Sequence, residues 1–525
     1  MGTALAAAAC VALPLVERAA AGEARFALTA PGPSAPPAAP ASGPRVRFPS
    51  RAPGPGEQYR FHVDMRACIG CKCCVVACNE QNGNPASINW RRVAELEGGW
   101  YPHARRAYLS MGCNHCIDPT CLSGCPVDAY RKDPATGIVL HSADACIGCQ
   151  YCTWNCSYGV PQYNPERGVV GKCDLCYGRL TLGQTPACAA ACPTGAIGIE
   201  IVNVAAWRDE VRRADPGSGV PTGDHSVSTT RISLPSGLPP DMRPAGSGRL
   251  APAEPHWPLV VMTVLTQLSV GAVAGIWLLD LLGGAPRLAA AALGSMATGA
   301  LALAASVLHL GRPAYAYRAV KMWRRSWLSR EVLLFSAFSG VACLYALLLW
   351  LRLPGAAAVG GLTVALGAGA VGASAQIYRV PSRPSWNTPM TLLEFACTAA
   401  VLGPLFDGVV GAGAPAWMAA AAAAAGGTSL GVIALRWLRA SASEVAERRA
   451  SARLLATVLA PTLMARGAML VLGAIALPLA APAAPWLAAA FALALGGELA
   501  GRYLFFVSAV PVHMSSPYLE DARPL

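Results

Sequence analysis

The chain has 525 residues, of which 54% are hydrophobic and only 13% are charged, with a formal net charge of +12. This length allows several domains, and so low a charged fraction is unusual for a soluble domain. A basic chain can bind nucleic acid, but residues 58–205 hold 12 Lys and Arg against 11 Asp and Glu. The excess lies largely in short segments between apolar runs, as in membrane proteins. Nucleic acid is therefore excluded as a partner.

Residues 1–57 are an N-terminal segment with an apolar start and a Pro/Ala-rich linker. The apolar run has the length of a signal peptide, but no basic residue precedes it and no twin-arginine pair is present. We expect a short apolar helix that packs on the protein or on a partner, with a signal peptide as the alternative. Residues 31–57 need not be ordered.

Residues 58–205 hold sixteen of the 20 cysteines in four groups of four. The first and third groups have the spacing C-x2-C-x2-C-x3-C, and the other two are variants of it. The groups are Cys68, Cys71, Cys74 and Cys78; Cys113, Cys116, Cys121 and Cys125; Cys146, Cys149, Cys152 and Cys156; and Cys173, Cys176, Cys188 and Cys192. Cys10, Cys73, Cys343 and Cys397 lie outside them.

Three kinds of chemistry use clustered cysteines. Disulfides suit small secreted domains, and zinc ribbons use isolated CxxC pairs. Neither explains a third cysteine after two residues and a fourth after three more. In that ferredoxin pattern, three thiolates hold one [4Fe–4S] cluster and the fourth belongs to a second. The spacing therefore favours four such clusters, with all sixteen cysteines as ligands.

The segment GCNHCIDPTCLSGCPVDAY…DACIGCQYCTWNCSYGVPQYNPE…GKCDLCYGRL resembles the four-cluster ferredoxin subunit of the dimethyl sulfoxide reductase family, from about residue 59 to 199. The resemblance implies an α+β ferredoxin-like domain in which group one pairs with group four and group two with group three. The implied ligand sets are Cys68, Cys71, Cys74 and Cys192; Cys78, Cys173, Cys176 and Cys188; Cys113, Cys116, Cys121 and Cys156; and Cys125, Cys146, Cys149 and Cys152. Some relatives lack the cysteine that matches Cys121 and hold a three-iron cluster there, so a cubane is expected here. Cys73 is expected to be a small buried side chain without a ligand role.

Eight apolar stretches follow, each near the roughly 20 residues that span a bilayer. They predict an all-α bundle of eight transmembrane helices at about 259–283, 287–310, 331–352, 355–378, 389–411, 414–435, 454–478 and 484–508. The loops after the second, fourth and sixth stretches, with the C-terminal tail, hold 14 basic residues, against two on the other side. The positive-inside rule places the basic loops, the ferredoxin domain and the C-terminus in the cytoplasm of a bacterial inner membrane.

The segments LHLGRPAYAYRAVKMWRRSWLSREVLLFS and PSWNTPMTLLEF resemble the membrane-anchor subunit of the same family, over about residues 257–510. The chain is therefore expected to be a fusion of two subunits. Its expected parts are residues 1–57, a ferredoxin domain at 58–205, a linker at 206–256, the anchor at 257–510 and a cytoplasmic tail at 511–525.

His309 ends the second stretch and Glu331 opens the third, both on the cluster side. Ionisable residues in membrane spans are functional candidates, and the matching residues of the resembling anchors are implicated in menaquinol binding. The alternatives are a helix-capping role for His309 and an ion pair between Glu331 and Arg330. Because His309 is nearly alone among the spans, we expect no haem.

These patterns predict an electron-transfer and anchor subunit, without catalytic action on the final substrate. It would pass electrons between the quinone pool and a separate molybdopterin-containing subunit, in a complex that oxidises sulfite at the cytoplasmic face. The alternatives are a dimethyl sulfoxide or other S/N-oxide reductase that oxidises menaquinol, the polysulfide or tetrathionate branch, and a zinc-stabilised membrane scaffold.

Overall fold

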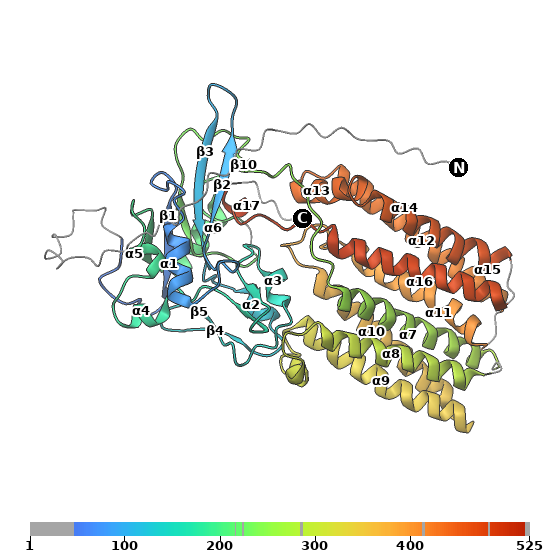
Figure 1. Cartoon of the computed structure of the whole chain (residues 1–525). Helices are drawn as coiled ribbons and strands as arrows, with labels where there is room; N and C mark the ends of the chain where they lie inside the picture. The colour runs from blue at the N-terminus through green and yellow to red at the C-terminus, as the bar shows by residue number, and fades with distance from the viewer. Residues whose placement is uncertain are drawn as a thin grey trace, which may run out of the picture. The chain divides into compact units, whose positions relative to one another are not determined.

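The computed structural model describes residues 47–215, 217–222, 225–283, 287–411, 415–480 and 484–519 (Figure 1). The helix expected near the N-terminus lies outside these residues. The described residues start with a cysteine-rich α+β part and continue into long helices, as the sequence predicts.

The α+β part is built on two three-stranded sheets. The first has β1 (Glu57–Asp64) between antiparallel β8 (Ile197–Asn203) and parallel β9 (Arg231–Ser233). In β1, Tyr59, Phe61 and Val63 of one face are buried, and so are Gln58 and His62 of the other, so both faces of this strand are covered. The second sheet pairs β2 (Arg92–Gly98) with β3 (Arg105–Met111) and β10 (Arg243–Pro244).

Two short hairpins and six helices complete this part. The hairpins are β4–β5 (Tyr130–Lys132 and Val139–His141) and β6–β7 (Gln162–Asn164 and Val169–Gly171). The helices are α1 (Cys73–Asn82), α2 (Thr120–Gly124), α3 (Tyr151–Asn155), α4 (Tyr177–Thr181), α5 (Ala187–Ala190) and α6 (Val204–Arg213). Pro119 and Pro186 precede α2 and α5, and a Cys-Pro pair follows each helix, so proline confines both to about one turn. Loops between these short helices carry most of the cysteines.

The described residues after 256 contain eight helices long and apolar enough to cross a membrane, which confirms the expected bundle. They are α7 (Trp257–Leu281), α8 (Leu288–Leu308), α9 (Trp327–Leu351), α10 (Ala356–Tyr378), α11 (Pro389–Val410), α12 (Ala416–Ser441), α14 (Ala460–Leu470), which continues through a π-helical turn (Val471–Ala476) into α15 (Leu477–Ala480), and α16 (Ala484–Val507). A short 3-10 helix (Pro313–Val320) precedes α9, and α13 (Ala446–Ala456) precedes α14.

Helix α7 is the central helix of the bundle. Its most apolar window is 83% buried, and α7 contacts α8, α10, α11 and α16. Gly271 lets it approach α11 closely, because a Cβ on the facing Gly403 would lie only 2.7 Å from the amide nitrogen of Ala272. Small residues at such crossings allow backbone packing that apolar side chains alone do not give in a membrane.

Two segments connect the α+β part to the bundle. Residues 206–256, expected to be a linker, contribute β9 and β10 to the two sheets. After α16 the chain returns: the Val512 amide donates to Ser382 O at 3.0 Å, and the Thr222 amide donates to Pro517 O at 2.8 Å. Tyr518, in α17 (Ser516–Leu519), is fully buried. The domain boundaries expected from the sequence remain predictions.

Candidate metal centres and their contact with the membrane helices

The structure gathers the sixteen grouped cysteines into four sets, each drawn from two groups that are separate in sequence. The first set is Cys68, Cys71, Cys74 and Cys192, and the second is Cys78, Cys173, Cys176 and Cys188. The third is Cys113, Cys116, Cys121 and Cys156, and the fourth is Cys125, Cys146, Cys149 and Cys152. The resemblance implies the same sets, and their role as metal ligands stays a prediction.

The first and third sets each line one cavity. All four cysteines of the first set border one small cavity with Ser110 and Thr194. All four of the third set border another small cavity with Lys172. Four thiols that converge on one enclosed space are suited to share one multinuclear cofactor.

The second and fourth sets are brought together in the same way. The thiol of Cys78 lies within electrostatic reach of Cys173, Cys176 and Cys188. In the fourth set, Cys152 lies within reach of Cys125, Cys146 and Cys149.

The four sets form a series. Cys74 of the first set lies within electrostatic reach of Cys188 in the second, and Cys173 of the second lies within reach of Cys113 in the third. Tyr130, which is 3% exposed, lies between the third and fourth sets, near Cys121, Cys125 and Cys152. The series runs from an exposed end, where Cys71 reaches the surface, to a mostly buried one.

Two further residues of the cysteine region, Cys73 and His115, differ in exposure. Cys73 was expected to be buried, and this is wrong: it is exposed at the start of α1. His115, within CNHC, is fully buried, and its Nδ1 accepts a hydrogen bond from the Val139 amide at 3.1 Å. Burial and then the nearby charge of Lys172 hold the pKa of His115 well below 6.5, so the ring is neutral.

Two buried cations lie among the cysteines, and the sequence analysis missed both. Arg91 is 1% exposed; its Nη1 donates to Ser110 Oγ at 3.1 Å, while Nε and Nη2 have no hydrogen-bond partner among the described residues. Burial lowers the pKa of Arg91, but the thiolates of Cys188 and Cys173 outweigh burial and raise it. Lys172 is 3% exposed and donates to the carbonyls of Val139 and Cys173. Neither forms an ion pair with a described carboxylate.

The fourth set lies against the loop after α8. The Arg312 amide donates to Ile147 O at 3.1 Å, and His309 Nε2 lies 3.2 Å from Cys149 O. Gly148 has a φ of +70°, and a Cβ on it would lie 2.8 Å from the Cα of Gly311. Glycine is therefore required between Cys146 and Cys149 both for its backbone conformation and for this close approach.

His309 and Glu331 adjoin a group of aromatic rings at this contact. Trp154 stacks on His309 with ring centroids 6.5 Å apart, and His256 lies 5.7 Å from His309. Glu331 is 7% exposed and lies within electrostatic reach of Tyr151 and Tyr378.

The two candidate residues are connected through these rings, because the ring centroids of Trp154 and Tyr378 are 5.8 Å apart. The sequence analysis did not connect His256 with His309. The sequence could have predicted that they are close. His256 precedes the first span and His309 follows the second, so two antiparallel spans place both residues at the same end of the bundle.

Comparison with known proteins agrees with this arrangement. Residues 104–201 match the 4Fe-4S dicluster domain family, and residues 252–507 match the DMSO reductase anchor subunit (DmsC) family. One chain of the anaerobic dimethyl sulfoxide reductase from Haemophilus influenzae is 41% identical over 150 residues, which are 27% of this chain and 73% of that protein. The chain therefore belongs to the dimethyl sulfoxide reductase family.

Two further relatives match the same part of the chain. The corresponding protein of the anaerobic dimethyl sulfoxide reductase from Escherichia coli is 40% identical over 148 residues, 27% of this chain and 72% of that protein. A sulfite dehydrogenase subunit from Allochromatium vinosum is 34% identical over 160 residues, 26% of this chain and 67% of that protein. The chain thus joins an electron-transfer iron–sulfur subunit and a DmsC-type anchor, as the sequence predicted, and it is a multi-pass membrane protein.

The buried cations fit the iron–sulfur clusters of this family. An unpaired cation in a protein interior costs several kcal/mol, and Arg91 has no carboxylate among the described residues to offset that cost. A cluster held by four thiolates is anionic, so the Arg91 guanidinium lies where negative charge is expected. Burial raises the pKa of the Cys149 and Cys176 thiols to about 12, so near neutral pH these thiols lose their protons only when a metal takes the protons' place.

We predict that Arg91→Met lowers the reduction potential of the neighbouring clusters by tens of millivolts, since a positive charge stabilises the more negative, reduced form. The measurement is a redox titration of the purified protein, followed by electron paramagnetic resonance. Arg106→Met is the matched control, because Arg106 is exposed on β3 and pairs with Glu95. Unchanged potentials in Arg91→Met, with iron content preserved, would contradict the assignment.

Proposed function

We propose that this chain passes electrons between the membrane quinone pool and a separate catalytic subunit that carries a molybdopterin cofactor. The observation that carries the proposal is the series of four cysteine sets, whose last member lies against the loop after α8. The relatives' names support it, since they are parts of dimethyl sulfoxide reductase and sulfite dehydrogenase. The series connects the surface of the α+β part to the membrane helices.

Each of the four sets would hold one [4Fe–4S] cluster. Such a cluster takes up and releases one electron at a time, at a potential that its hydrogen bonds and solvent exposure adjust. The cavities lined by the first and third sets support this assignment, as do the cations beside the sets. Sixteen thiolates suffice for four clusters, which leaves Cys73 without a ligand role.

We predict about 16 iron atoms and as many acid-labile sulfides per purified chain. Cys121→Ser should remove about one iron and leave a three-iron cluster, detected by electron paramagnetic resonance of the oxidised protein, because the third set would keep only three thiolates. Cys73→Ser is the control and should keep the full iron content. Loss of iron in Cys73→Ser, or a zinc-loaded protein without labile sulfide, would contradict the four-cluster proposal.

A zinc-stabilised scaffold is the alternative of another class. Zinc needs its ligands around one ion at about 2.3 Å from each sulfur. Among the described residues, no group of three His, Cys, Asp or Glu side chains is placed to hold a single ion. A cubane takes one thiolate at each of four irons and so holds its thiolates further apart.

The exposed end of the series would meet the catalytic subunit. Cys71 is exposed there, and Ile69 and Val76 are each 60% exposed beside the first set. Exposed apolar side chains next to a redox group are suited to a partner surface. The order of the sets then carries electrons from the partner's surface to the membrane, or in reverse.

His309 and Glu331 would bind the quinone at the other end. Oxidation of a quinol releases two electrons and two protons, so its oxygens need hydrogen-bonding groups and a proton acceptor. Glu331 is buried beside Tyr151 and Tyr378, and its neighbour Ser374 also faces it. His309 contacts the backbone of a cluster ligand, Cys149. The aromatic rings between them supply an apolar surface for a quinone ring.

We predict that Glu331→Gln slows reduction of the clusters by a menaquinol analogue about 10²-fold, the usual loss when a general base is removed. Dithionite, which bypasses the quinone, should still reduce the clusters fully. His309→Gln should likewise slow reduction of the clusters by the menaquinol analogue and leave their reduction by dithionite unchanged. Asp280→Asn is the matched control. Asp280 is a carboxylate near the end of α7 that lies away from the cysteine sets, and its Oδ2 accepts a 3.4 Å hydrogen bond from the Tyr345 hydroxyl. Equal rates in Glu331→Gln and wild type would exclude Glu331 from the quinone site.

The distribution of charge supports a cytoplasmic position for the α+β part. Between the spans predicted from the sequence, the segments on that side and the C-terminal tail hold fourteen basic residues, against two on the other side, in agreement with the positive-inside rule. This position favours oxidation of a cytoplasmic substrate such as sulfite over reduction of a sulfoxide outside the membrane. Both substrates are named for relatives of the α+β part.

We predict that, in inverted membrane vesicles of cells that express the complete complex, external sulfite reduces the quinone pool without detergent. Right-side-out vesicles should respond only after permeabilisation, because the catalytic subunit would then be enclosed. The second arm supplies dimethyl sulfoxide to vesicles with a reduced quinone analogue. Activity with dimethyl sulfoxide alone would overturn the sulfite assignment, and activity in intact right-side-out vesicles would overturn the orientation.

A further inference from the structure

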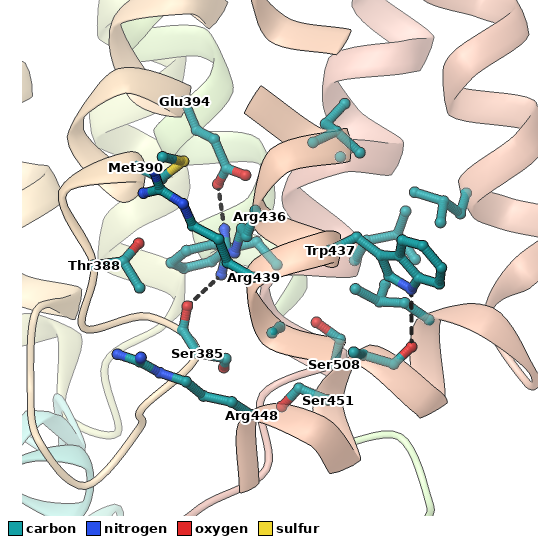
Figure 2. Close-up of a pocket in the computed structure, with 18 of the residues that line it drawn as sticks. Ser385, Thr388, Met390, Glu394, Arg436, Trp437, Arg439, Arg448, Ser451 and Ser508 are labelled. Carbon is teal, nitrogen blue, oxygen red and sulfur yellow. Dashed lines mark hydrogen bonds and ion pairs between the residues drawn. The ribbon is translucent and has the colours of Figure 1, made fainter. Parts of the chain in front are cut away.

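A cavity of about 520 Å³ lies in the second half of the membrane bundle (Figure 2). The loop after α10, the starts of α11 and α14, the end of α12 and parts of α13 and α16 line it. It is at the end of the bundle that faces the cysteine sets, because Ser382 of the same loop donates to Trp154 O. Neither His309 nor Glu331 borders it, so it is distinct from the proposed quinone site.

Arginine dominates the charge of this cavity. Its ionisable lining residues are Arg379, Glu394, Arg436, Arg439, Arg448 and Arg466. The single carboxylate is already neutralised, since Arg436 Nη1 donates to Glu394 Oε2 at 2.5 Å (Figure 2). Glu394 also lies within electrostatic reach of Arg466, so one carboxylate faces five guanidinium groups, of which only Arg439 is exposed. Such a surplus beside an apolar bundle is costly unless an anion offsets it.

Arg466 is the second, independent indication of a ligand. It is 7% exposed, it borders the cavity, and its Nε has no hydrogen-bond partner among the described residues. The Nε of Arg379, which also borders the cavity, is likewise buried and without a partner there. Buried guanidinium donors are normally satisfied. Two of them at one cavity point to acceptors that the described residues do not supply.

The rest of the lining is largely apolar. Trp437, Leu455, Leu463, Leu504 and Phe505 border the same space, and Trp437 is held by a 3.3 Å hydrogen bond from its Nε1 to Ala452 O (Figure 2). A free inorganic anion would make no favourable contact with these apolar walls. A molecule with an anionic head and an apolar body would match both halves of the cavity.

We propose that this cavity binds the phosphate headgroup of an anionic phospholipid. Arg448 and Arg466 would pair with the phosphate oxygens, and the apolar walls would contact the beginning of the acyl chains. Arginine recognises phosphate through paired N–H donors, and basic pockets between membrane helices on the cytoplasmic side are suited to anionic headgroups. A neutral quinone needs no surplus of four cations, which argues against a second quinone site.

The test measures lipid binding to the purified, cluster-loaded protein in detergent by native mass spectrometry, with the melting temperature as a second readout. The three probes are phosphatidylglycerol, phosphatidylcholine and inorganic phosphate at equal phosphorus concentration. We expect phosphatidylglycerol to bind at least about tenfold more tightly than phosphatidylcholine and to raise the melting temperature. Inorganic phosphate should do neither.

Arg448→Gln and Arg466→Gln should each weaken phosphatidylglycerol binding about fivefold, the usual effect of one basic residue near a membrane surface. Arg324→Gln is the matched control, since Arg324 is exposed in the basic loop before α9. Arg448 is only half-buried, so its variant keeps the test decisive if Arg466→Gln fails to fold.

Three results would overturn the proposal. Equal binding of phosphatidylcholine would exclude an anionic headgroup site, and an equal effect of inorganic phosphate would exclude a lipid. Displacement of phosphatidylglycerol by a quinone analogue, with the same sensitivity to Arg448→Gln, would make the cavity a quinone site instead.

Discussion

The contact of Gly148 with Gly311 is the constraint on which the rest of the structure depends. These residues approach at a distance that no side chain permits, and Gly168 O faces both of them. Because Gly148 lies between Cys146 and Cys149, the contact fixes the fourth cysteine set against the membrane helices. His309 lies two residues before Gly311, so its ring directly contacts Cys149 O. A substituent at either glycine would separate Cys146 and Cys149 from the membrane helices.

Charge compensation is the second principle that links the two parts of the chain. In the α+β part, Arg91 and Lys172 are buried without carboxylates among the described residues, and anionic clusters account for them. In the bundle, Glu394 pairs with Arg436, while Arg502 donates to Gln267 Oε1 at 2.8 Å. The surplus of arginine gathers at the cavity beside Arg466, and that surplus identifies the place where an external anion fits.

The sequence predicted what local spacing determines. The ferredoxin spacing predicted clustered cysteines, and apolar length predicted eight membrane helices that the structure confirms. The sequence did not predict that Arg91 is buried. In NWRRV this residue lies just before strand β2, and its burial depends on packing between cysteine loops that are distant in the sequence. Trp154 lies within CTWNC, but nothing in that motif shows that its ring meets His309. Cys73 was wrongly expected to be buried, since the residue between two ligands can face outward at a helix start.

Joining the two subunits in one chain changes what their contact must achieve. Separate subunits must overcome the entropy of association, whereas a covalent connection makes docking intramolecular at high effective concentration. Here the connection is also ordered, because β9 and β10 pair with the two sheets before the chain enters α7. After α16 the chain returns to the α+β part, where the Tyr518 hydroxyl lies 2.5 Å from Ser228 Oγ. Two anchored crossings hold the α+β part in place. The contact itself adds the packing of Trp154 against Tyr378 and Trp386 and an ion pair between Arg325 and Asp128. With the glycine contact, these interactions keep the fourth cysteine set beside His309.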